Sequence, residues 1–321
     1  MLTRAGQESG GETPHPAPPA RVRLRPGVRR ERRREALAAY LFLLPAVLGL
    51  GLLFLYPLVG TFLTSFTEQK MFGRSEWVGG ENYKRLLGDA KLARSIWNSV
   101  LYMGINLLGV PIATVIAAAI HQVSRYKNIY RVLYFLPVVT LPVAVAMVWR
   151  FIFSGDFGLL NYLLSLIGVQ GQYWLADARF TIYALSVVGI WMGLGTTIIL
   201  LGAGLQGIPV EIYEAAALDG ASRWRQFLSI TLPLLSPTIF FVTILSVING
   251  LQVFDLVFIM LRGSNNTALI GSQTIVYQFY QTAFVEGARG YGAAIAILLL
   301  MIIMVFTLIQ FRLQKRWVFY E

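Results

Sequence analysis

The chain has 321 residues, of which 56 % are hydrophobic and 13 % charged, and its formal net charge is +11. Because soluble domains carry about 25 % charged residues, this composition excludes an ordinary soluble protein. The absence of cysteine from the sequence excludes disulfides, thiolate metal sites and a cysteine nucleophile.

Six long uncharged runs predict the class of protein. A run of about 18 or more apolar residues is long enough for a helix to cross a bilayer, and a helix satisfies its own backbone hydrogen bonds in lipid. The runs lack the alternation of polar and apolar residues that marks the strands of a membrane β-barrel. The sequence therefore predicts an all-α, multi-spanning membrane protein, with six transmembrane helices at about 36–67, 95–122, 132–153, 180–205, 236–261 and 290–311.

The N-terminal 35 residues are predicted to be a disordered basic tail. Eight arginines lie between Arg21 and Arg34, directly before the first span. Such a block marks the cytoplasmic side of a membrane protein, an interpretation that we favour over a nucleic-acid-binding arm. Six spans then place both termini in the cytoplasm. The transmembrane domain is expected at 36–312, with core spans at 95–312, and a second short basic tail follows at 313–321.

Two features inside the spans and two connections between them carry further predictions. The third span contains Pro137 and Pro142, and Gly189 and Gly193 form a GxxxG pattern that predicts a close helix contact in the fourth span. The stretches 154–179 and 263–286 are predicted to be mostly polar loops on the outer side.

Motifs for catalysis and energy supply are missing from the sequence. It has no Gly-x-x-x-x-Gly-Lys-Ser/Thr loop for phosphate, no histidine cluster and no Gly-x-Ser-x-Gly. The span interiors hold almost no ionisable residue; Asp255 is the exception and is placed towards the outer end of its span. We therefore predict no catalytic residue, metal site or cofactor, and we expect the energy for any transport to come from another subunit.

A polar stretch at 207–233 separates the fourth and fifth predicted spans. Pro209 suits the first position of a helix, Gly220 is a natural helix terminator, and Ser222 can cap the next helix. Leu232-Pro233 is expected to end that second helix just before the fifth span. The pattern predicts two short cytoplasmic helices with a tight bend, which either dock onto another protein or lie on lipid headgroups.

The same stretch resembles a known family. Glu214-Ala215-Ala216 is followed after three residues by Gly220, after nine more by Ile230 and after one more by Leu232-Pro233. This spacing is similar to the full EAA-loop signature of ABC-importer permeases. Three further segments resemble the carbohydrate-uptake permeases of the maltose and glycerol-3-phosphate type: Asp219-Gly220-Ala221, Val253-Phe254-Asp255 and Gly290-Tyr291-Gly292-Ala293-Ala294-Ile295.

The resemblance implies a fold, a set of partners and a coupling site. The fold would be that of a type I ABC-importer transmembrane domain in a bacterial inner membrane. A second permease subunit would complete the pathway, a cytoplasmic ATPase dimer would use ATP, and an extracytoplasmic protein would deliver solute. The permease itself would be no enzyme. The hairpin would contact the ATPase through Glu214, Ala215, Ala216, Asp219, Gly220, Ile230, Leu232 and Pro233.

Four residues of the fifth predicted span are candidates for the solute path. In one helix, Asn249, Gln252 and Asp255 would share an arc of about 120°. Together with Phe254, and with Tyr280 of the following segment, they offer hydrogen bonds and an aromatic face to a sugar. The alternative is that the polar groups bond only to a neighbouring helix. A permease for a polyamine or phosphate ester, an ion-coupled carrier and a membrane enzyme are the competing functions.

Overall fold

The computed structural model describes residues 26–69, 75–122, 127–261 and 266–319, and the chain forms two compact units, Met1–Leu58 and Val59–Glu321. Residues 1–25 of the predicted tail lie outside the described residues. The first unit contains helix α1 (Pro26–Leu50), a π-helical turn (η1, Gly51–Leu55) and the beginning of α2 (Tyr56–Thr64). Helix α1 thus begins before residue 35, inside the stretch predicted to be disordered, because proline is well suited to a first helical position.

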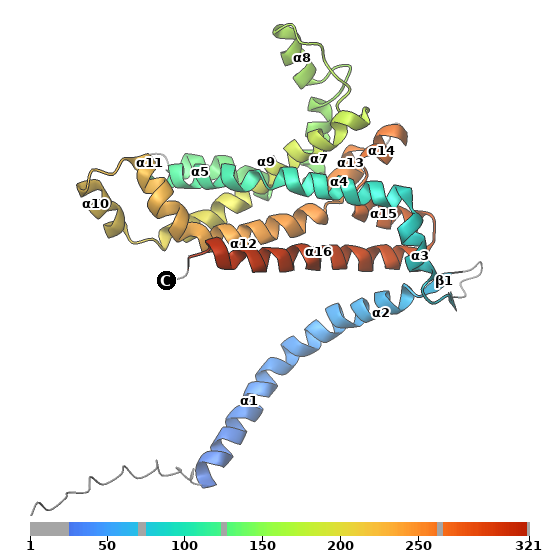
Figure 1. Cartoon of the computed structure of the whole chain (residues 1–321), viewed down its shortest axis with the longest axis horizontal. Helices are drawn as coiled ribbons and strands as arrows, with labels where there is room; N and C mark the ends of the chain where they lie inside the picture. Colours follow the sequence, from blue (N-terminus) through green and yellow to red (C-terminus); the bar gives the residue numbers. More distant parts are fainter. Residues whose placement is uncertain (1–25, 70–74, 123–126, 262–265, 320–321) are drawn as a thin grey trace, which may run out of the picture. The chain divides into compact units, whose positions relative to one another are not determined.

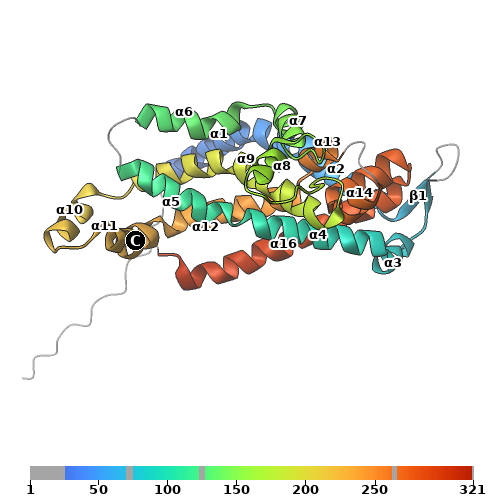
Figure 2. The same ribbon diagram turned by 90° about the horizontal axis from the view of Figure 1, so that it is seen from above.

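A bundle of long helices forms the second unit. It consists of α4 (Ala90–Asn106), α5 (Gly109–Gln122), α9 (Ala178–Gln206), α12 (Leu232–Leu251) and α16 (Arg289–Trp317). Figures 1 and 2 show these helices running alongside one another. Helix α9 is central, because it contacts α4, α5 and α12. Its buried side chains include Leu185, Val188, Leu201 and Leu205.

The number of membrane-crossing helices agrees with the sequence if one bent pair is counted. Among the described residues, five helical stretches are long and apolar enough to span, and α6 (Lys127–Val139) with α7 (Pro142–Ile152) makes a possible sixth. These two helices meet at an angle of 106°. The span predicted at 132–153 is therefore broken into two helices just before Pro142. Leu141 is extended (φ −65°, ψ 128°) because a residue before proline avoids the helical region.

The predicted fifth span is also displaced. A continuous helical stretch begins at Arg223, as α11 (Arg223–Gln226), passes through a π-helical turn (η2, Phe227–Thr231) and continues as α12 to Leu251. A separate short helix, α13 (Asp255–Met260), follows it. The prediction of 236–261 is thus wrong at both ends: the π-helical turn carries the helix past Pro233, and α12 stops at Leu251 before α13 begins.

The predicted outer loops contain helices. Residues 154–179 include α8 (Leu159–Leu166), and the second stretch includes α14 (Asn266–Ser272), α15 (Ile275–Tyr280) and a π-helical turn (η3, Gln281–Val285). Asn98 of α4 donates to the carbonyls of Gly271 (2.9 Å) and Gln273 (3.0 Å), and Ser99 accepts from the backbone N–H of Ile275. These bonds hold the second stretch against the bundle, so the prediction of a loop is wrong there.

At the end of the bundle opposite to α10, a small hairpin and α3 adjoin α16 (Figure 2). Strands β1 (Thr67–Gln69) and β2 (Ser75–Trp77) pair antiparallel, and α3 (Glu81–Gly88) follows them. Asn82 of α3 donates to the carbonyls of Ser65 and Thr67, both at 2.9 Å. Gly290 of α16 lies so close to the Thr67 carbonyl that any side chain there would clash.

Asp89 links α4 to α16. It accepts hydrogen bonds from the backbone N–H groups of Lys91 (2.9 Å) and Leu92 (3.1 Å), and from the Tyr291 hydroxyl (2.7 Å). The Arg85 guanidinium lies 4.0 Å from the centroid of that tyrosine ring. Burial raises the pKa of Asp89, but the hydrogen bonds from Tyr291, Leu92 and Lys91 outweigh burial and hold this pKa below its ordinary value.

Candidate coupling hairpin and solute pocket

The polar stretch after α9 folds into a hairpin of two helices, at one end of the bundle (Figure 1). Helix α10 (Val210–Leu218) begins after Pro209 and ends at Gly220, whose φ is +77°. The N–H of Gly220 donates to Ala217, and the N–H of Ala221 donates to Ala216 at 2.9 Å. This pair of bonds is a Schellman motif, in which glycine takes the left-handed position without strain. The predicted role of Gly220 in making the bend is confirmed.

The second helix of the hairpin has a local cap. Ser222 is extended, and its hydroxyl accepts a hydrogen bond from the N–H of Arg225 at 3.3 Å, as predicted for an N-cap. Gln226 donates through its side chain to the Ala221 carbonyl at 3.0 Å. The two helices are also joined by a hydrogen bond of 3.0 Å between the hydroxyls of Tyr213 and Thr231. Short-range bonds therefore fix the shape of the hairpin.

The hairpin exposes apolar as well as charged side chains. Leu218 is 90 % exposed and Trp224 is 65 % exposed. Glu214, Ala215 and Asp219 are exposed too, and Ala216 is half-buried. Large apolar side chains in such a position favour burial against another surface.

The candidate coupling residues divide into two groups. Glu214, Ala215, Ala216, Asp219 and Gly220 lie in or directly after α10, at the tip of the hairpin. Ile230, Leu232 and Pro233 are half-buried at its root, inside the helical stretch that leads into the bundle. The expectation that Leu232-Pro233 ends the second helix is wrong, because the π-helical turn and α12 continue it without a break.

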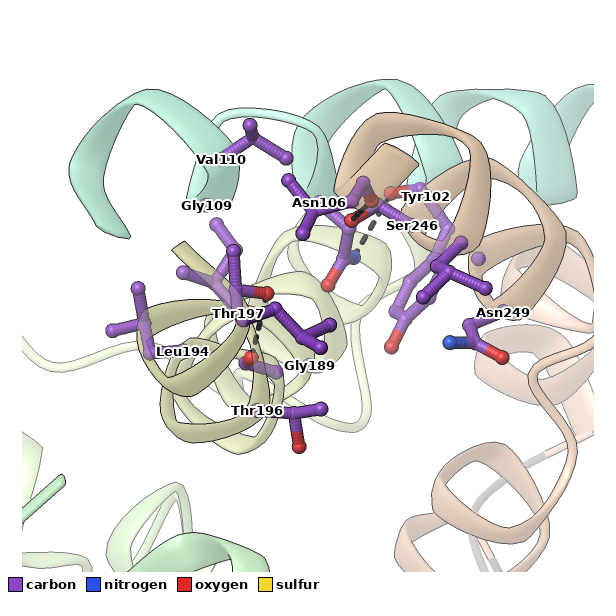
Figure 3. A pocket seen from close by; sticks show the side chains of 16 residues that line it. Tyr102, Asn106, Gly109, Val110, Gly189, Leu194, Thr196, Thr197, Ser246 and Asn249 are labelled. Atoms are coloured by element: carbon purple, nitrogen blue, oxygen red, sulfur yellow. Dashed lines mark hydrogen bonds between the residues drawn. The ribbon is translucent and has the colours of Figure 1, made fainter. Parts of the chain in front are cut away.

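A cavity of about 200 Å³ with several polar side chains lies in the second unit, between α4, α5, α9 and α12 (Figure 3). Each of its lining residues is uncharged. The polar side chains around it are Tyr102, Asn106, Thr196, Thr197, Ser246 and Asn249. Three of them bond to their own helices: Asn106 to the Tyr102 carbonyl (2.9 Å), Thr197 to Gly193 (2.9 Å) and Ser246 to Val242 (2.8 Å).

Glycines on α9 make room for this cavity. A Cβ at Gly189 would lie 2.1 Å from the Tyr102 hydroxyl and 2.5 Å from the Asn106 side-chain oxygen. A Cβ at Gly193 would meet nothing within 4 Å. The predicted close helix contact is therefore present at Gly189, whereas Gly193 faces open space in the cavity.

Of the predicted solute-path residues, only Asn249 lines this cavity. Its side chain makes no hydrogen bond within the part of the chain that the structure describes. Helix α12 ends at Leu251, Gln252 forms its C-cap and Asp255 begins α13. The predicted arc of Asn249, Gln252 and Asp255 on one helix is thus wrong. The break is held by Thr274, whose hydroxyl donates to the Val253 carbonyl at 2.9 Å.

Phe254 belongs to an aromatic cluster outside the cavity. Its ring stacks on Phe258 with centroids 5.3 Å apart and lies 5.2 Å from Tyr280. Tyr277 and Phe284 extend the same cluster. Phe254 and Tyr280, the two aromatic residues predicted to stack on a solute, therefore contact each other.

Sequence reasoning missed most of the cavity. Tyr102, Asn106, Thr196, Thr197 and Ser246 all lie within apolar spans, where polar side chains often mark a functional site. That signal was present, but several other polar residues of the spans are buried and bonded elsewhere: Ser186, for example, donates to the Ile182 carbonyl.

These features define a class of protein: a multi-spanning helical membrane protein with an uncharged polar cavity among its helices and a folded hairpin exposed at one end. This is the architecture of a transport permease. The chain belongs to the family described as "Binding-protein-dependent transport system inner membrane component", which its residues 109–319 match.

Several permease proteins are similar in sequence to this chain over most of its length. The probable ABC transporter permease protein YesP of Bacillus subtilis is 33 % identical over 298 residues, which cover 90 % of this chain and 94 % of YesP. The arabinooligosaccharides transport system permease protein AraP of the same organism is 32 % identical, with 86 % and 88 % covered. The trehalose/maltose transport system permease protein MalF of Thermococcus litoralis is 30 % identical, with 88 % and 95 % covered.

Solved structures share the fold. A chain of a bacterial ABC transporter that imports the acidic polysaccharide alginate has a TM-score of 0.78 at 24 % identity, with 90 % of this chain and 99 % of that chain covered. A chain of a bacterial alginate ABC transporter in complex with an alginate pentasaccharide-bound periplasmic protein also has a TM-score of 0.78, at 23 % identity, with 89 % and 96 % covered. The chain therefore has the all-α, type I ABC-importer transmembrane fold that the sequence predicts.

Proposed function

We propose that this chain is a permease subunit of a binding-protein-dependent ABC importer for sugars or sugar-like solutes, and that a separate ATPase drives it through the hairpin at 207–233. The observation that carries the proposal is the hairpin itself. It is rigid through local bonds, it projects from the bundle, and it exposes Leu218 and Trp224 beside charged residues. A partner surface that covers it would bury apolar area at a site that is already folded.

The hairpin would face the cytoplasm. Basic residues gather at the same end of the bundle: Arg223 and Arg225 follow the bend, while Lys315 and Arg316 lie in the last turn of α16 (Figure 1). An excess of Lys and Arg in short segments beside spans marks the cytoplasmic side. On this topology both termini are cytoplasmic, in a bacterial inner membrane, and the end with α3 and β1 faces outward.

The energy source and the other partners follow from that arrangement. The chain would bind no cofactor of its own; ATP would be hydrolysed by a cytoplasmic ATPase dimer that grips the hairpin tip at Glu214, Ala215, Ala216, Asp219 and Gly220. The root residues Ile230, Leu232 and Pro233 would pass the movement to α12. A second permease subunit would complete the pathway, and an extracytoplasmic protein would deliver solute at the outer end.

A neutral solute suits the cavity. Its lining offers amide and hydroxyl groups without a charged side chain, which matches the hydrogen-bonding surface of a sugar. A polyamine or a phosphate ester would bring a net charge with no partner to neutralise it. The names of AraP and MalF, which refer to arabinooligosaccharides and to trehalose and maltose, point the same way. Gln252, Phe254 and Asp255 remain candidates for an earlier step of the path, on the outer side of the cavity.

Gly220→Val tests the coupling role. Valine would have to adopt a φ of +77°, and a left-handed residue with a Cβ costs about 1–2 kcal/mol, or about ten-fold in an equilibrium constant. We expect uptake per ATP hydrolysed to fall about ten-fold in proteoliposomes that hold the complete importer, while the thermal stability of the bundle stays unchanged. Gly202→Val is the matched control, because a Cβ at Gly202 meets nothing within 4 Å. Coupled uptake that survives Gly220→Val would refute the docking role.

Asn249→Ala tests the cavity. The loss of one good hydrogen bond to solute corresponds to about a five-fold weaker interaction. We therefore expect the solute concentration for half-maximal uptake to rise about five-fold, with co-purification of the ATPase unchanged. Thr243→Ala is the comparison, since Thr243 lies on the same helix and does not line the cavity. If Asn249→Ala instead abolished assembly of the importer, Asn249 would be a structural residue between helices.

A further inference from the structure

The last described residues of the chain pack against the root of the coupling hairpin. Helix α16 ends at Trp317, and the rings of Phe311 and Trp317 both approach the Phe240 ring of α12 edge-on, with centroids 5.6 Å and 6.1 Å apart. Phe240 is 6 % exposed. The end of α16 is therefore fixed to the N-terminal half of α12 by a small aromatic cluster of these three rings.

Beyond Trp317 the backbone binds a serine side chain of α12, and this serine replaces a hydrogen bond that the α12 backbone cannot make. The carbonyl of Pro233 would normally accept from the N–H of residue 237, but Pro237 has no N–H. The Ser236 hydroxyl donates to this carbonyl instead, at 2.6 Å. The N–H of Phe319 in turn donates to the Ser236 hydroxyl oxygen at 3.0 Å. Ser236 is 3 % exposed, and the C-terminal backbone completes a partly buried chain of two hydrogen bonds on it.

This chain of bonds lies at a weak joint in the helical stretch from Arg223 to Leu251. The π-helical turn at 227–231 and the prolines Pro233 and Pro237 interrupt the regular backbone ladder within eleven positions. The same joint connects the hairpin to the bundle.

The Phe319 side chain also lies near the other connection between hairpin and bundle, which joins α9 to α10. It lines a cavity of about 500 Å³ together with the end of α9, the entry of the hairpin and the first turns of α12. The remaining lining residues are Gly204, Gly207, Ile208, Pro209, Pro233, Leu234 and Pro237. The C-terminal segment thus touches both chain crossings between hairpin and bundle.

We propose that the segment Trp317–Phe319 is a brace that stiffens the joint between the coupling hairpin and α12, so that hairpin and span move as one body. The proposal rests on the proposed function in one respect, namely that movement of the hairpin drives transport. The positioning residues are Ser236 and Phe319. Without the brace the π-helical turn flexes, and hairpin movement is partly lost before it reaches α12.

The first measurement is amide hydrogen exchange of residues 223–236 in the complete importer. Ending the chain after Trp317 removes the Phe319 N–H, and Ser236→Ala removes the hydroxyl. We expect exchange in this segment to become about five-fold faster in each variant, which is the change that corresponds to one net hydrogen bond. Ser236→Thr keeps the hydroxyl and should behave as the parent. Thr243→Ala is the matched control, because its hydroxyl bonds only to the Ile239 carbonyl of its own helix.

The second measurement is the amount of solute taken up per ATP hydrolysed. We expect this ratio to fall two- to five-fold in the truncated and Ser236→Ala variants, with the amount of assembled importer unchanged. A residue with a merely structural role would change the amount and leave the ratio. Pro237→Ala supplies a backbone N–H to the Pro233 carbonyl, so we expect it to restore both exchange and ratio in the Ser236→Ala variant, in which that carbonyl has lost its hydroxyl donor.

The outcomes separate this proposal from the proposed function. Unchanged exchange after truncation, or no rescue by Pro237→Ala, overturns the brace. Faster exchange with an unchanged ratio overturns its role in coupling. If Gly220→Val leaves uptake coupled, the proposed function fails, and the exchange measurement still decides whether the tail stiffens the joint.

Discussion

The coupling hairpin and the polar cavity are built in opposite ways. The hairpin owes its shape to bonds between near neighbours, such as Ala221 to Ala216 and Arg225 to Ser222. The cavity exists only where four helices meet, and it joins Tyr102, Gly189 and Asn249 from distant parts of the chain. The difference teaches that the hairpin can be pushed without losing its shape, whereas the cavity changes shape whenever its helices shift. A transporter needs a rigid part that receives movement from a partner and a cavity whose shape changes as the helices shift.

The largest effect that tests this contrast between hairpin and cavity is expected from a substitution that adds a side chain at Gly189. Because its Cβ would lie 2.1 Å from the Tyr102 hydroxyl, we expect Gly189→Val to destabilise the bundle by about 1–3 kcal/mol, as overpacking does. Uptake should be lost as well. The measurement is the apparent melting temperature in detergent, paired with uptake in proteoliposomes.

Gly193→Val gives the matched control for that change. It is on the same helix and beside the same cavity, but its Cβ meets no atom within 4 Å. We expect reduced uptake with a stability within about 0.5 kcal/mol of the parent. Equal melting temperatures for the two variants would mean that the close contact at Gly189 contributes nothing to the packing.

Asp89 and Ser222 both cap helices, but Asp89 makes a long-range contact whereas Ser222 makes local ones. Loss of Asp89 should therefore lower the stability of the whole bundle more than loss of Ser222. Asp89 also binds Tyr291, 202 residues away, so Asp89→Asn should lower global stability by about 1 kcal/mol, because a charged acceptor is lost at a partly exposed site. The folded-state pKa of Asp89 is lowered, so its stabilising effect is present above the ordinary aspartate pKa of about 3.9 and is lost as the pH falls through the lower folded-state pKa. Melting curves between neutral and acid pH should show this loss in the parent and a flatter profile in Asp89→Asn. An identical acid profile in both would contradict the contribution of Asp89.

Ser222→Ala should have the smallest effect. Loss of an N-cap costs about 1 kcal/mol locally, but the contacts of Ser222 lie within the hairpin. We therefore expect faster amide exchange in α11 with an unchanged melting temperature. A clear fall of the melting temperature would show that the hairpin is coupled to the stability of the whole bundle, and the contrast drawn above would fail.

The parts of the molecule that sequence reasoning predicted well are those with local causes. Pro209, Gly220 and Ser222 each impose a backbone conformation on their own positions, so the start, bend and second cap of the hairpin were all predictable. The apolar runs were likewise sufficient for the all-α membrane class, since length and hydropathy act within one segment.

The errors lie where distant contacts decide the backbone. The contact that holds the helix break after Leu251 is distant in the sequence, because the hydroxyl that donates to the freed Val253 carbonyl comes from Thr274. The helices within 266–285 are held by Asn98 and Ser99, which are far away in the sequence. Proline usually ends a helix, so the sequence predicts a helix end at Pro233, whereas the preceding π-helical turn allows the helix to continue through it. The cavity was missed for the same reason: no single segment contains it.

The π-helical turn at Phe227–Thr231 also sets the direction in which the hairpin points. Such a turn holds one residue more than a regular α-helical turn would. One residue corresponds to a rotation of about 100° around the helix axis. Removal of that extra residue would leave α12 in place and rotate Arg223–Gln226, with the whole hairpin tip, by about that angle. The five residues of this turn therefore determine which side of the hairpin faces a partner.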